Sequence, residues 1–285
     1  MHILVTGKQG YVGTQFENWM AKHHFEEQVD LQSVRPQNVE MIDFTNYDIV
    51  LHAAALVHRK ETAESANDYQ RINVELTEKL AEKAKAAGVK QFVFLSTVAV
   101  YGEEGRFEEK KIAVSQEPRP VSQYGMSKYI AERRLKQLET ADFHVAIIRP
   151  PMIYGPDCPG NYARLAKLAR KVPFFPTIEG ERSMLFIDNL SAFLYEVMVG
   201  NLRGIYVPQN RELVNTTQLV MLIAAANGKK IKTSKFVGIF FQKTLQNIPI
   251  FRKMFGNLVF EAGNQVLHEM IDLQASIIRT EKNAS

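Results

Sequence analysis

Cysteine and long apolar runs are nearly absent from the sequence. Cys158 is the single cysteine in 285 residues, which excludes an intramolecular disulfide, and no Cys/His spacing typical of a metal site is present, so we expect no bound metal. The longest apolar run, residues 219–226, is far shorter than the roughly 20 residues that cross a bilayer. The first five residues lack the basic start of a signal peptide. We therefore expect a cytoplasmic protein without a transmembrane segment.

The net charge is small but unevenly placed. It is +4 at neutral pH, and residues 229–260 contain seven Lys or Arg and no acidic residue, so the rest of the chain is net acidic. This basic segment is compatible with a solvated surface, with an anionic ligand such as a nucleoside diphosphate, or with an acidic membrane surface. Nucleic acid is not expected as a partner, because no nucleic-acid recognition motif is present.

The composition, 46% hydrophobic and 23% charged, is that of a globular protein. Apolar strand patterns alternate with helical ones, with strands expected at 2–6, 48–53, 91–96 and 144–149 and helices at about 7–22, 67–87 and 122–138. This alternation predicts an α/β fold, a Rossmann-type doubly wound parallel sheet with helices on both faces. We expect a dinucleotide-binding domain over residues 1–150 and a smaller C-terminal substrate lobe over 151–285. Within that lobe, residues 184–207 are candidates to pack back on the first domain.

A glycine-rich turn follows the first strand. Gly7, Gly10 and Gly13 have the spacing G-x-x-G-x-x-G and open a helix. Glycines at these positions permit a tight turn, let the backbone approach a pyrophosphate and let the helix pack closely on the strand, while the helix N-terminus offers free N–H groups to the anion. A turn of this kind after the first strand of a βαβ unit predicts dinucleotide binding.

The second strand leaves the choice between NAD and NADP open. In such folds an acidic residue about 20 residues beyond the glycines binds the adenosine ribose of NAD, whereas an arginine accommodates the 2′-phosphate of NADP. If Asp30 faces the ribose, NAD is expected. If the strand ends at Ser33, Arg35 can hold the 2′-phosphate and NADP is expected.

Tyr124 and Lys128 are spaced four residues apart, which places them on one face of the expected helix over 122–138. A nearby cation favours the phenolate and lowers the pKa of a tyrosine toward neutrality, so Tyr124 is a candidate general acid and base. Ser96 and Thr97 add hydroxyl groups at the carboxyl end of a strand, where parallel α/β sheets hold their ligands.

Further motifs follow in a characteristic order. Together they are the glycine turn, Asp43-Phe44, residues 52–55, Asn73, Ser96-Thr97 through Tyr101-Gly102, Tyr124 with Lys128, Arg149-Pro150 through residues 154–156, Arg182 and residues 186–188. With these motifs the chain resembles the extended short-chain dehydrogenase/reductase family, in its branch of NAD-dependent nucleoside-diphosphate-sugar epimerases, dehydratases and reductases. The resemblance covers nearly the whole chain.

The resemblance implies three catalytic residues. Thr97 would hydrogen-bond the oxygen on the reacting sugar carbon, Tyr124 would transfer its proton, and Lys128 would bind the nicotinamide ribose and tune Tyr124. The expected substrate contacts are Thr97, Tyr124, Asn161 and Arg182, the last two near the diphosphate. The expected contacts to NAD or NADP are Gly7, Gln9, Gly10, Tyr11, Val12, Gly13, Asp43, Phe44, Ala53, Ala54, Ala55, Asn73, Tyr124, Lys128 and Pro150. Asp43 and Phe44 would bracket the adenine.

Two departures from the family pattern bear on the reaction. The acidic pair that follows the threonine in dehydratases is replaced by Val98-Ala99, whose apolar side chains cannot transfer protons, so a 4,6-dehydratase is not expected. Met152 stands where the family has an asparagine, so one expected contact to the diphosphate or the sugar is missing.

Two enzymatic reactions at C4 of a nucleotide sugar, with UDP as the expected carrier, fit this pattern. We expect a UDP-sugar 4-epimerase for surface polysaccharide synthesis, and the alternative is an NAD(P)H-dependent 4-ketoreductase of a UDP-4-keto-6-deoxy sugar. A third reading is a dinucleotide-binding protein that catalyses nothing. Relatives of that kind usually lose the tyrosine or the lysine, whereas Thr97, Tyr124 and Lys128 are all present.

The apolar and basic run over residues 236–260 has two interpretations. It includes Phe240, Phe241, Ile248, Ile250, Phe251 and Phe255. We expect it to pack into the core or the nucleotide pocket, in preference to lying on a membrane. A homodimer through a helix pair is common in the family, and the sequence leaves the oligomeric state open.

Overall fold

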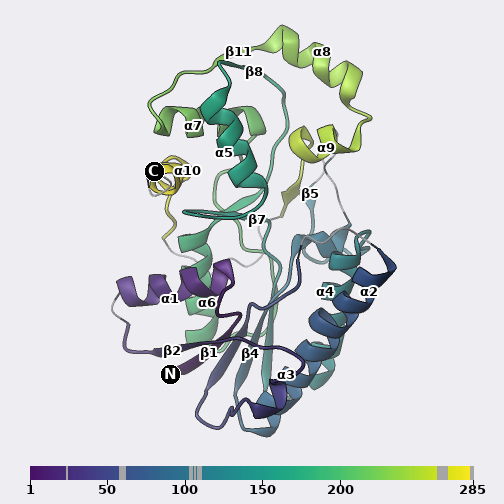
Figure 1. Cartoon of the computed structure of the whole chain (residues 1–285), viewed down its shortest axis with the longest axis vertical. Coiled ribbons are helices and arrows are strands. Elements are labelled where there is room, and N and C mark those ends of the chain that lie inside the picture. The colour runs from purple at the N-terminus through teal and green to yellow at the C-terminus, as the bar shows by residue number, and fades with distance from the viewer. Residues whose placement is uncertain are drawn as a thin grey trace.

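The computed structural model describes residues 1–23, 25–57, 62–102, 105, 107, 111–261 and 269–282. Its centre is a six-stranded, wholly parallel sheet in the order β10-β6-β4-β3-β1-β2 (Figure 1). The strands are β1 (His2–Thr6), β2 (Gln28–Gln32), β3 (Ile49–His52), β4 (Gln91–Leu95), β6 (His144–Ile148) and β10 (Gly204–Tyr206). The four strands expected from the apolar runs are confirmed, each within a residue at either end.

Side chains alternate between the two faces of this sheet, and both faces are covered. Val5 and Leu51 belong to the core on one face, where α1 (Tyr11–Lys22) and α6 (Ile187–Val199) pack. Leu4 and Val50 belong to the core on the other, which α3 (Leu76–Ala86) and α4 (Gln123–Leu138) cover. Figure 1 shows these two helical layers on opposite sides of the strands. The expected doubly wound α/β fold is confirmed.

The helix expected over 67–87 begins earlier than its apolar pattern indicates. Thr62 accepts a hydrogen bond from the backbone N–H of Ser65, and the Ser65 hydroxyl accepts one from the N–H of Thr62. This reciprocal cap starts α2 (Ala63–Tyr69), which continues through a π-helical segment (Gln70–Glu75) into α3.

The strand order reverses direction beside β1. The chain passes from β1 to β2 on one side and then crosses back to β3 on the other side of β1. In open α/β sheets ligands bind at such a reversal, outside the carboxyl ends of the strands. The fold therefore places the glycine turn and the ends of β3 and β4 around one crevice.

Most of the chain after β6, apart from α6 and β10, forms the upper half of the molecule in Figure 1. Three small parallel pairs, β7 (Met152–Tyr154) with β9 (Met184–Phe186), β8 (Phe174–Pro176) with β11 (Lys232–Ser234), and β5 (Lys111–Ile112) with β12 (Val259–Phe260), hold this half together. Helix α7 (Thr216–Ala226) packs against both α5 (Asn161–Lys171) and α10 (Leu273–Lys282). Strand β10, from the segment 184–207, pairs with β6 in the main sheet. The domain boundary near residue 150 stays a prediction.

The apolar run over 236–260 divides into two parts. In α9 (Pro249–Phe255) and β12, Phe251, Phe255 and Phe260 are buried, as expected. In α8 (Lys235–Leu245), the side chain of Phe236 is 88% exposed and that of Phe240 is 66% exposed, and Phe241 is exposed too. Ile248, which follows α8, is also exposed. The expectation of core or pocket packing is therefore wrong for α8, because only its Gly238 side is covered. The side chain of Ile250 lies outside the described residues. In the described part of the chain no helix is long and apolar enough to cross a membrane.

Candidate active site

A cavity of about 660 Å³ lies at the carboxyl ends of the central strands. It is bordered by the glycine turn, the ends of β2, β3 and β4, the start of α4 and residues 150–153. Of the predicted site residues, it brings together Gly7, Gln9, Gly10, Tyr11, Val12, Ala53, Ala54, Ala55, Thr97, Tyr124, Lys128, Pro150 and Asn161. A second cavity of about 720 Å³, between α1, α6 and α10, contains none of them.

The glycine turn is closed on itself and leaves room for a ligand. The N–H of Gly10 donates to the carbonyl of Gly7 at 2.6 Å. Gly7 has φ +95°, and a Cβ there would stand 3.2 Å from the backbone of Ala54. Helix α1 begins directly after Gly10 without a side-chain cap, so its first N–H groups are free to bind an anion.

Gly13 belongs to the same turn but does not line the cavity. A Cβ on Gly13 would stand 3.2 Å from the side chain of Val5 on β1. Gly13 thus allows the helix to approach the strand closely, and its contact with a cofactor stays a prediction.

Tyr11 provides a test of whether a dinucleotide fits. Its hydroxyl is buried and has no hydrogen-bond partner among the described residues, although Tyr11 lines the cavity. Burial raises the pKa of this phenol well above its ordinary value, so it remains a donor. A buried donor without a partner is costly, and this hydroxyl, which lies beside Gly155, can still donate to a polar group that enters the cavity. The residues present fit a nicotinamide dinucleotide.

The end of β2 favours one of the two cofactor alternatives. Ser33, Val34 and Arg35 follow β2 and line the cavity. The carboxylate of Asp30 instead accepts a hydrogen bond from the hydroxyl of Tyr47 at 2.8 Å and lies 2.9 Å from Nε2 of His2. The carboxylate of Asp30 thus contacts Tyr47 and His2 and does not line the cavity. Arg35 is the charged residue that lines the cavity where β2 ends.

The start of α4 is held directly against the turn that carries Thr97. The Thr97 hydroxyl caps a short 3₁₀ helix (Val98–Tyr101) by accepting from the N–H of Ala99 at 3.2 Å. Ser122 caps α4 in the same way, accepting from the N–H of Gly125 at 3.0 Å. A Cβ on Gly125 would stand only 2.7 Å from the carbonyl oxygen of Ala99. This close approach brings Tyr124 and Thr97 to the wall of one cavity.

Lys128 lies beneath this wall and is fully buried. Its Nζ donates to the carbonyl of Leu95 at 2.8 Å and stands 4.4 Å from the centre of the Phe94 ring. Burial lowers the pKa of Lys128 to about 7, partly offset by the carboxylate of Glu132.

The pKa of Tyr124 moves opposite to the expected direction. Burial, with a smaller effect of Tyr69, raises it above its ordinary value. The expectation that Lys128 lowers this pKa is wrong here, because the ammonium is directed to the Leu95 carbonyl. Burial thus favours the protonated form of Tyr124.

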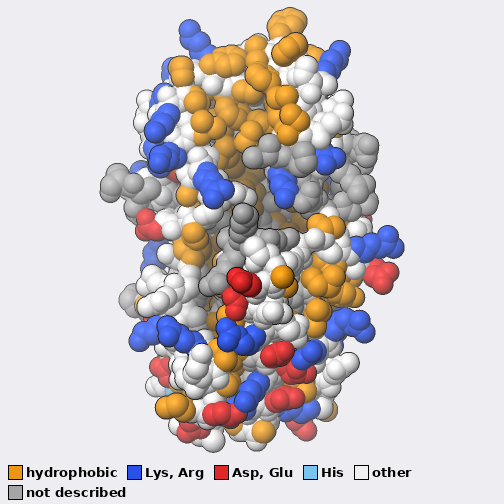
Figure 2. Space-filling model, turned by 45° about the vertical axis from the view of Figure 1, so that its right-hand side comes forward, with side chains coloured by type: hydrophobic (Ala, Val, Ile, Leu, Met, Phe, Trp, Pro, Cys, Tyr) orange, Lys and Arg blue, Asp and Glu red, His pale blue; other side chains and the backbone are white. Residues whose placement is uncertain are grey.

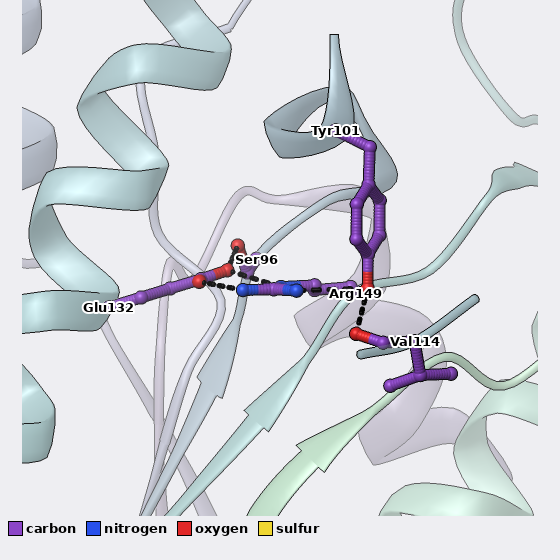
Figure 3. Close-up of polar contacts among 5 residues, drawn as sticks. All are labelled: Ser96, Tyr101, Val114, Glu132 and Arg149. Atoms are coloured by element: carbon purple, nitrogen blue, oxygen red, sulfur yellow. Dashed lines mark hydrogen bonds and ion pairs between the residues drawn. The ribbon is translucent and has the colours of Figure 1, made fainter. Parts of the chain in front are cut away.

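A buried polar network lies behind the catalytic turn (Figure 3). Glu132, one helical turn beyond Lys128 on α4, accepts from the Ser96 hydroxyl at 2.5 Å and forms an ion pair with the guanidinium of Arg149. Arg149 also donates to the hydroxyl of Tyr101 at 2.9 Å, which donates to the carbonyl of Val114 at 2.9 Å. The network ties α4 to the ends of β4 and β6. Sequence reasoning missed Glu132, although its spacing of four from Lys128 was a usable signal.

Besides Gly13, four predicted site residues lie outside the residues that line the cavity: Asp43, Phe44, Asn73 and Arg182. The Asp43 carboxylate accepts from the N–H and hydroxyl of Thr45, and Phe44 is buried in the core beneath α3. The predicted bracketing of an adenine by this pair stays a prediction.

Asn73 and Arg182 have partners within the protein. The amide of Asn73 exchanges hydrogen bonds with the backbone of Leu56 and donates to the Ser127 hydroxyl, so it links the loop after β3 to α4. Arg182 donates to the carbonyl of Lys253, and burial lowers its pKa to about 10. Its backbone bridges to Leu258, which does line the cavity. Its contact with a diphosphate stays a prediction.

No group of three or more potential metal ligands occurs among the described residues. The cavity wall also includes residues that no motif pointed to, namely Lys8, Val57, Cys158 and Leu258. Leu258 lies 134 positions beyond Tyr124 in the chain, and only the tertiary fold brings it to this wall.

Comparisons with known proteins place this geometry in a family. The model of the NAD dependent epimerase/dehydratase family matches residues 3–198. The chain is 30% identical to the UDP-glucose 4-epimerase of Vibrio cholerae over 209 residues, which are 66% of this chain and 63% of that protein. The chain thus spans less than two thirds of that relative.

Solved structures share the fold over almost the whole chain. The UDP-glucuronic acid 4-epimerase of Bacillus cereus in complex with NAD matches with a TM-score of 0.75 and 16% identity, covering 99% of this chain and 98% of that one. The RMD protein of Pseudomonas aeruginosa complexed with NADPH matches with a TM-score of 0.75 and 19% identity, covering 99% of both chains. The glycine turn, the orphaned Tyr11 hydroxyl and the extent of the family match agree: this chain belongs to the NAD dependent epimerase/dehydratase family.

Proposed function

We propose that the chain transfers a hydride between a nicotinamide dinucleotide and C4 of a UDP-sugar, in the direction of NADPH-dependent reduction of a 4-keto sugar. The observation that carries the choice of NADPH is Arg35 at the β2 border of the cavity, with Asp30 engaged elsewhere. An arginine at this place suits the 2′-phosphate of NADP. The reduced form of that cofactor suits net reduction.

The protonation state of Tyr124 supports the same direction. Reduction of a ketone needs a proton at the oxygen as hydride reaches the carbon, so the catalytic side chain must begin protonated. Burial raises the pKa of Tyr124, which favours the protonated form that this direction needs. An epimerase begins with the opposite step, removal of a proton from the C4 hydroxyl, for which a lowered tyrosine pKa is the better starting point.

Each catalytic side chain has a defined task in this proposal. The Thr97 hydroxyl, on the cavity wall, orients the C4 oxygen, and Tyr124 donates the proton to that oxygen. When bound, the dinucleotide supplies the hydride. Lys128 binds the nicotinamide ribose, while its bond to the carbonyl of Leu95 holds its ammonium at the end of β4. Because all three line one cavity, a purely cofactor-binding role is disfavoured.

The 4-epimerase expected from the sequence is the second candidate. Its support is the 30% identity with a UDP-glucose 4-epimerase over 209 residues. In both candidates we propose UDP as the carrier, with Asn161 at the N-terminus of α5 nearest the diphosphate. A place in surface polysaccharide synthesis and a cytoplasmic location remain predictions.

The two candidates are separated by cofactor content and net turnover. The purified protein would be denatured and its released nucleotides identified by mass spectrometry, and the native protein would then be assayed with a UDP-4-keto-6-deoxy-hexose and with UDP-hexoses. The ketoreductase predicts a largely empty site and consumption of one NADPH per keto sugar reduced. Near-stoichiometric bound NAD, with interconversion of UDP-hexoses and no net cofactor consumption, would establish the epimerase instead.

A further inference from the structure

Helix α8 presents an apolar face to solvent. Phe236, Ile239 and Phe240 are 88%, 53% and 66% exposed, and their spacing of three and four residues places them on one side of the helix. Exposed aromatic side chains grouped in this way are unusual on a soluble protein and mark an interaction site. These three side chains do not line the cavity of the candidate active site, to which Leu258 is the contribution of residues 229–260.

The opposite side of α8 is fixed to the protein, so the apolar face has a defined direction. A Cβ on Gly238 would stand within 1.7 Å of the carbonyl oxygen of Thr177, and only glycine permits this approach. Ser234 caps the helix by accepting from the N–H of Val237. The preceding strand β11 pairs with β8 in the same lobe.

Exposed lysines lie on α8 and on the segment directly before it. Lys230, Lys232, Lys235 and Lys243 are all exposed, and residues 229–260 contain no acidic residue. Figure 2 shows hydrophobic side chains gathered at the upper end of the molecule with Lys and Arg around them, whereas the acidic side chains in view lie mainly in the lower half. The α8 surface, defined here as Phe236, Ile239 and Phe240 with these four lysines, is thus apolar at its centre and cationic around it.

We propose that the α8 surface docks the protein on an anionic lipid bilayer. An apolar helix face flanked by lysines matches the interface of such a bilayer, where aromatic side chains enter the headgroup region and lysines meet lipid phosphates. A second copy of this chain is the less suitable occupant. Two α8 surfaces facing each other around a two-fold axis would oppose their lysine clusters, and like charges at close range repel.

The docking is independent of the reaction proposed for the cavity and is tested with the full chain and no substrate. Flotation would use vesicles of phosphatidylcholine containing about a quarter phosphatidylglycerol, and vesicles of phosphatidylcholine alone. We expect binding to the anionic vesicles, at least about tenfold weaker binding to the neutral ones, and loss of most binding at about 0.5 M salt, where charges are screened.

Two pairs of substitutions locate the contact. Phe236→Ser with Phe240→Ser removes the apolar centre, and Lys235→Glu with Lys243→Glu reverses two charges; each pair should lower vesicle binding at least about tenfold. Because these side chains are exposed, the fold should persist, which circular dichroism checks. The matched controls are Met41→Ser, at an apolar side chain 82% exposed on another surface, and Lys90→Glu with Lys136→Glu, which changes the net charge equally. The controls should bind as the unchanged protein does.

Three results would overturn the proposal. One is absence of binding to anionic vesicles. Another is binding that the control substitutions weaken as much as the α8 substitutions do. The third is a dimer in sedimentation analysis that the Phe236→Ser, Phe240→Ser variant dissociates while vesicle binding is absent, which would assign the surface to a second copy of the chain.

Discussion

The carboxylate of Glu132 and the guanidinium of Arg149 form a two-point ion pair at 2.5 and 3.0 Å, with both side chains at most 3% exposed. The same carboxylate accepts the hydroxyl of Ser96, the residue directly before Thr97. The pair therefore joins α4, which carries Tyr124 and Lys128, to the strand end that carries Thr97. We therefore expect it to affect the proposed reaction through the positions of these residues.

Removing one partner of this pair should be strongly destabilising. Glu132→Ala leaves Arg149 as a buried charge without a counter-ion, so we expect the free energy of unfolding to fall by about 3–5 kcal/mol in urea titration. The matched control is Glu78→Ala, in the Glu78–Arg134 pair, whose side chains are about one third exposed; there the loss should stay below about 1 kcal/mol. Equal losses in the two variants would contradict a special role for the buried pair.

Burial of Lys128 makes stability depend on pH. Its pKa in the folded chain is lowered to about 7, below that of an unfolded lysine at about 10.4. Between these values the unfolded chain binds the additional proton, so the contribution of Lys128 to the free energy of unfolding rises with pH from about 7 to 10, by up to about 1.4 kcal/mol per pH unit. Lys128→Met should remove this rise in urea titrations at several pH values. Lys136→Met, at an exposed site, should retain it, and parallel curves for wild type and Lys128→Met would refute the assignment.

The contact between α4 and the catalytic turn should not tolerate a methyl group. Gly125→Ala places a Cβ 2.7 Å from the carbonyl oxygen of Ala99, so the helix or the turn must move and Tyr124 shifts relative to Thr97. Displacements of about 1 Å at a catalytic group can lower rates about 100-fold, and we expect a loss of this size in kcat with a smaller change in cofactor affinity. Met126→Ala, at an exposed neighbour on the same helix, should leave kcat near the wild-type value.

Arg35 should determine the choice between the two dinucleotides. Arg35→Ala removes the cation that we assign to the 2′-phosphate, so NADPH affinity should fall at least about tenfold, equivalent to about 1.4 kcal/mol, while NADH affinity stays unchanged. Lys8→Ala is the control, because Lys8 lies in the glycine turn, where we expect the diphosphate common to both cofactors, and its loss should affect both affinities equally. Fluorescence titration measures both affinities, and an equal loss for NADPH and NADH in Arg35→Ala would argue against this role.

The four inner strands of the central sheet could be predicted because they are short, mainly apolar runs that are buried on both faces. The glycine turn could be predicted as well, because a tight turn between a strand and a helix requires glycines at this spacing. Phe44 and Asn73 show the limit of such reasoning: their positions in the chain fit a cofactor site, but the direction of each side chain depends on the packing of α3 and α4 around them.

The α8 surface and the pKa of Tyr124 depend on tertiary structure alone. An apolar run normally indicates burial, and the exposure of Phe236 follows from the approach of Gly238 to Thr177, residues far apart in the sequence. The spacing of Tyr124 and Lys128 correctly places them on one helix, yet the Lys128 ammonium bonds to the carbonyl of Leu95 on a strand. Helical spacing carries no information about that partner.

The most direct test of the proposed reaction is the fate of the transferred hydrogen. NADPH carrying deuterium at the reactive nicotinamide carbon would be incubated with a UDP-4-keto-6-deoxy-hexose and the protein, with Tyr124→Phe as the catalytic control, and the sugar would be analysed by NMR. The account predicts deuterium at C4 of the product, one NADPH oxidised for each sugar reduced, and a rate at least about 100-fold lower in Tyr124→Phe. A C4 position without deuterium, or an unchanged rate in Tyr124→Phe, would contradict it.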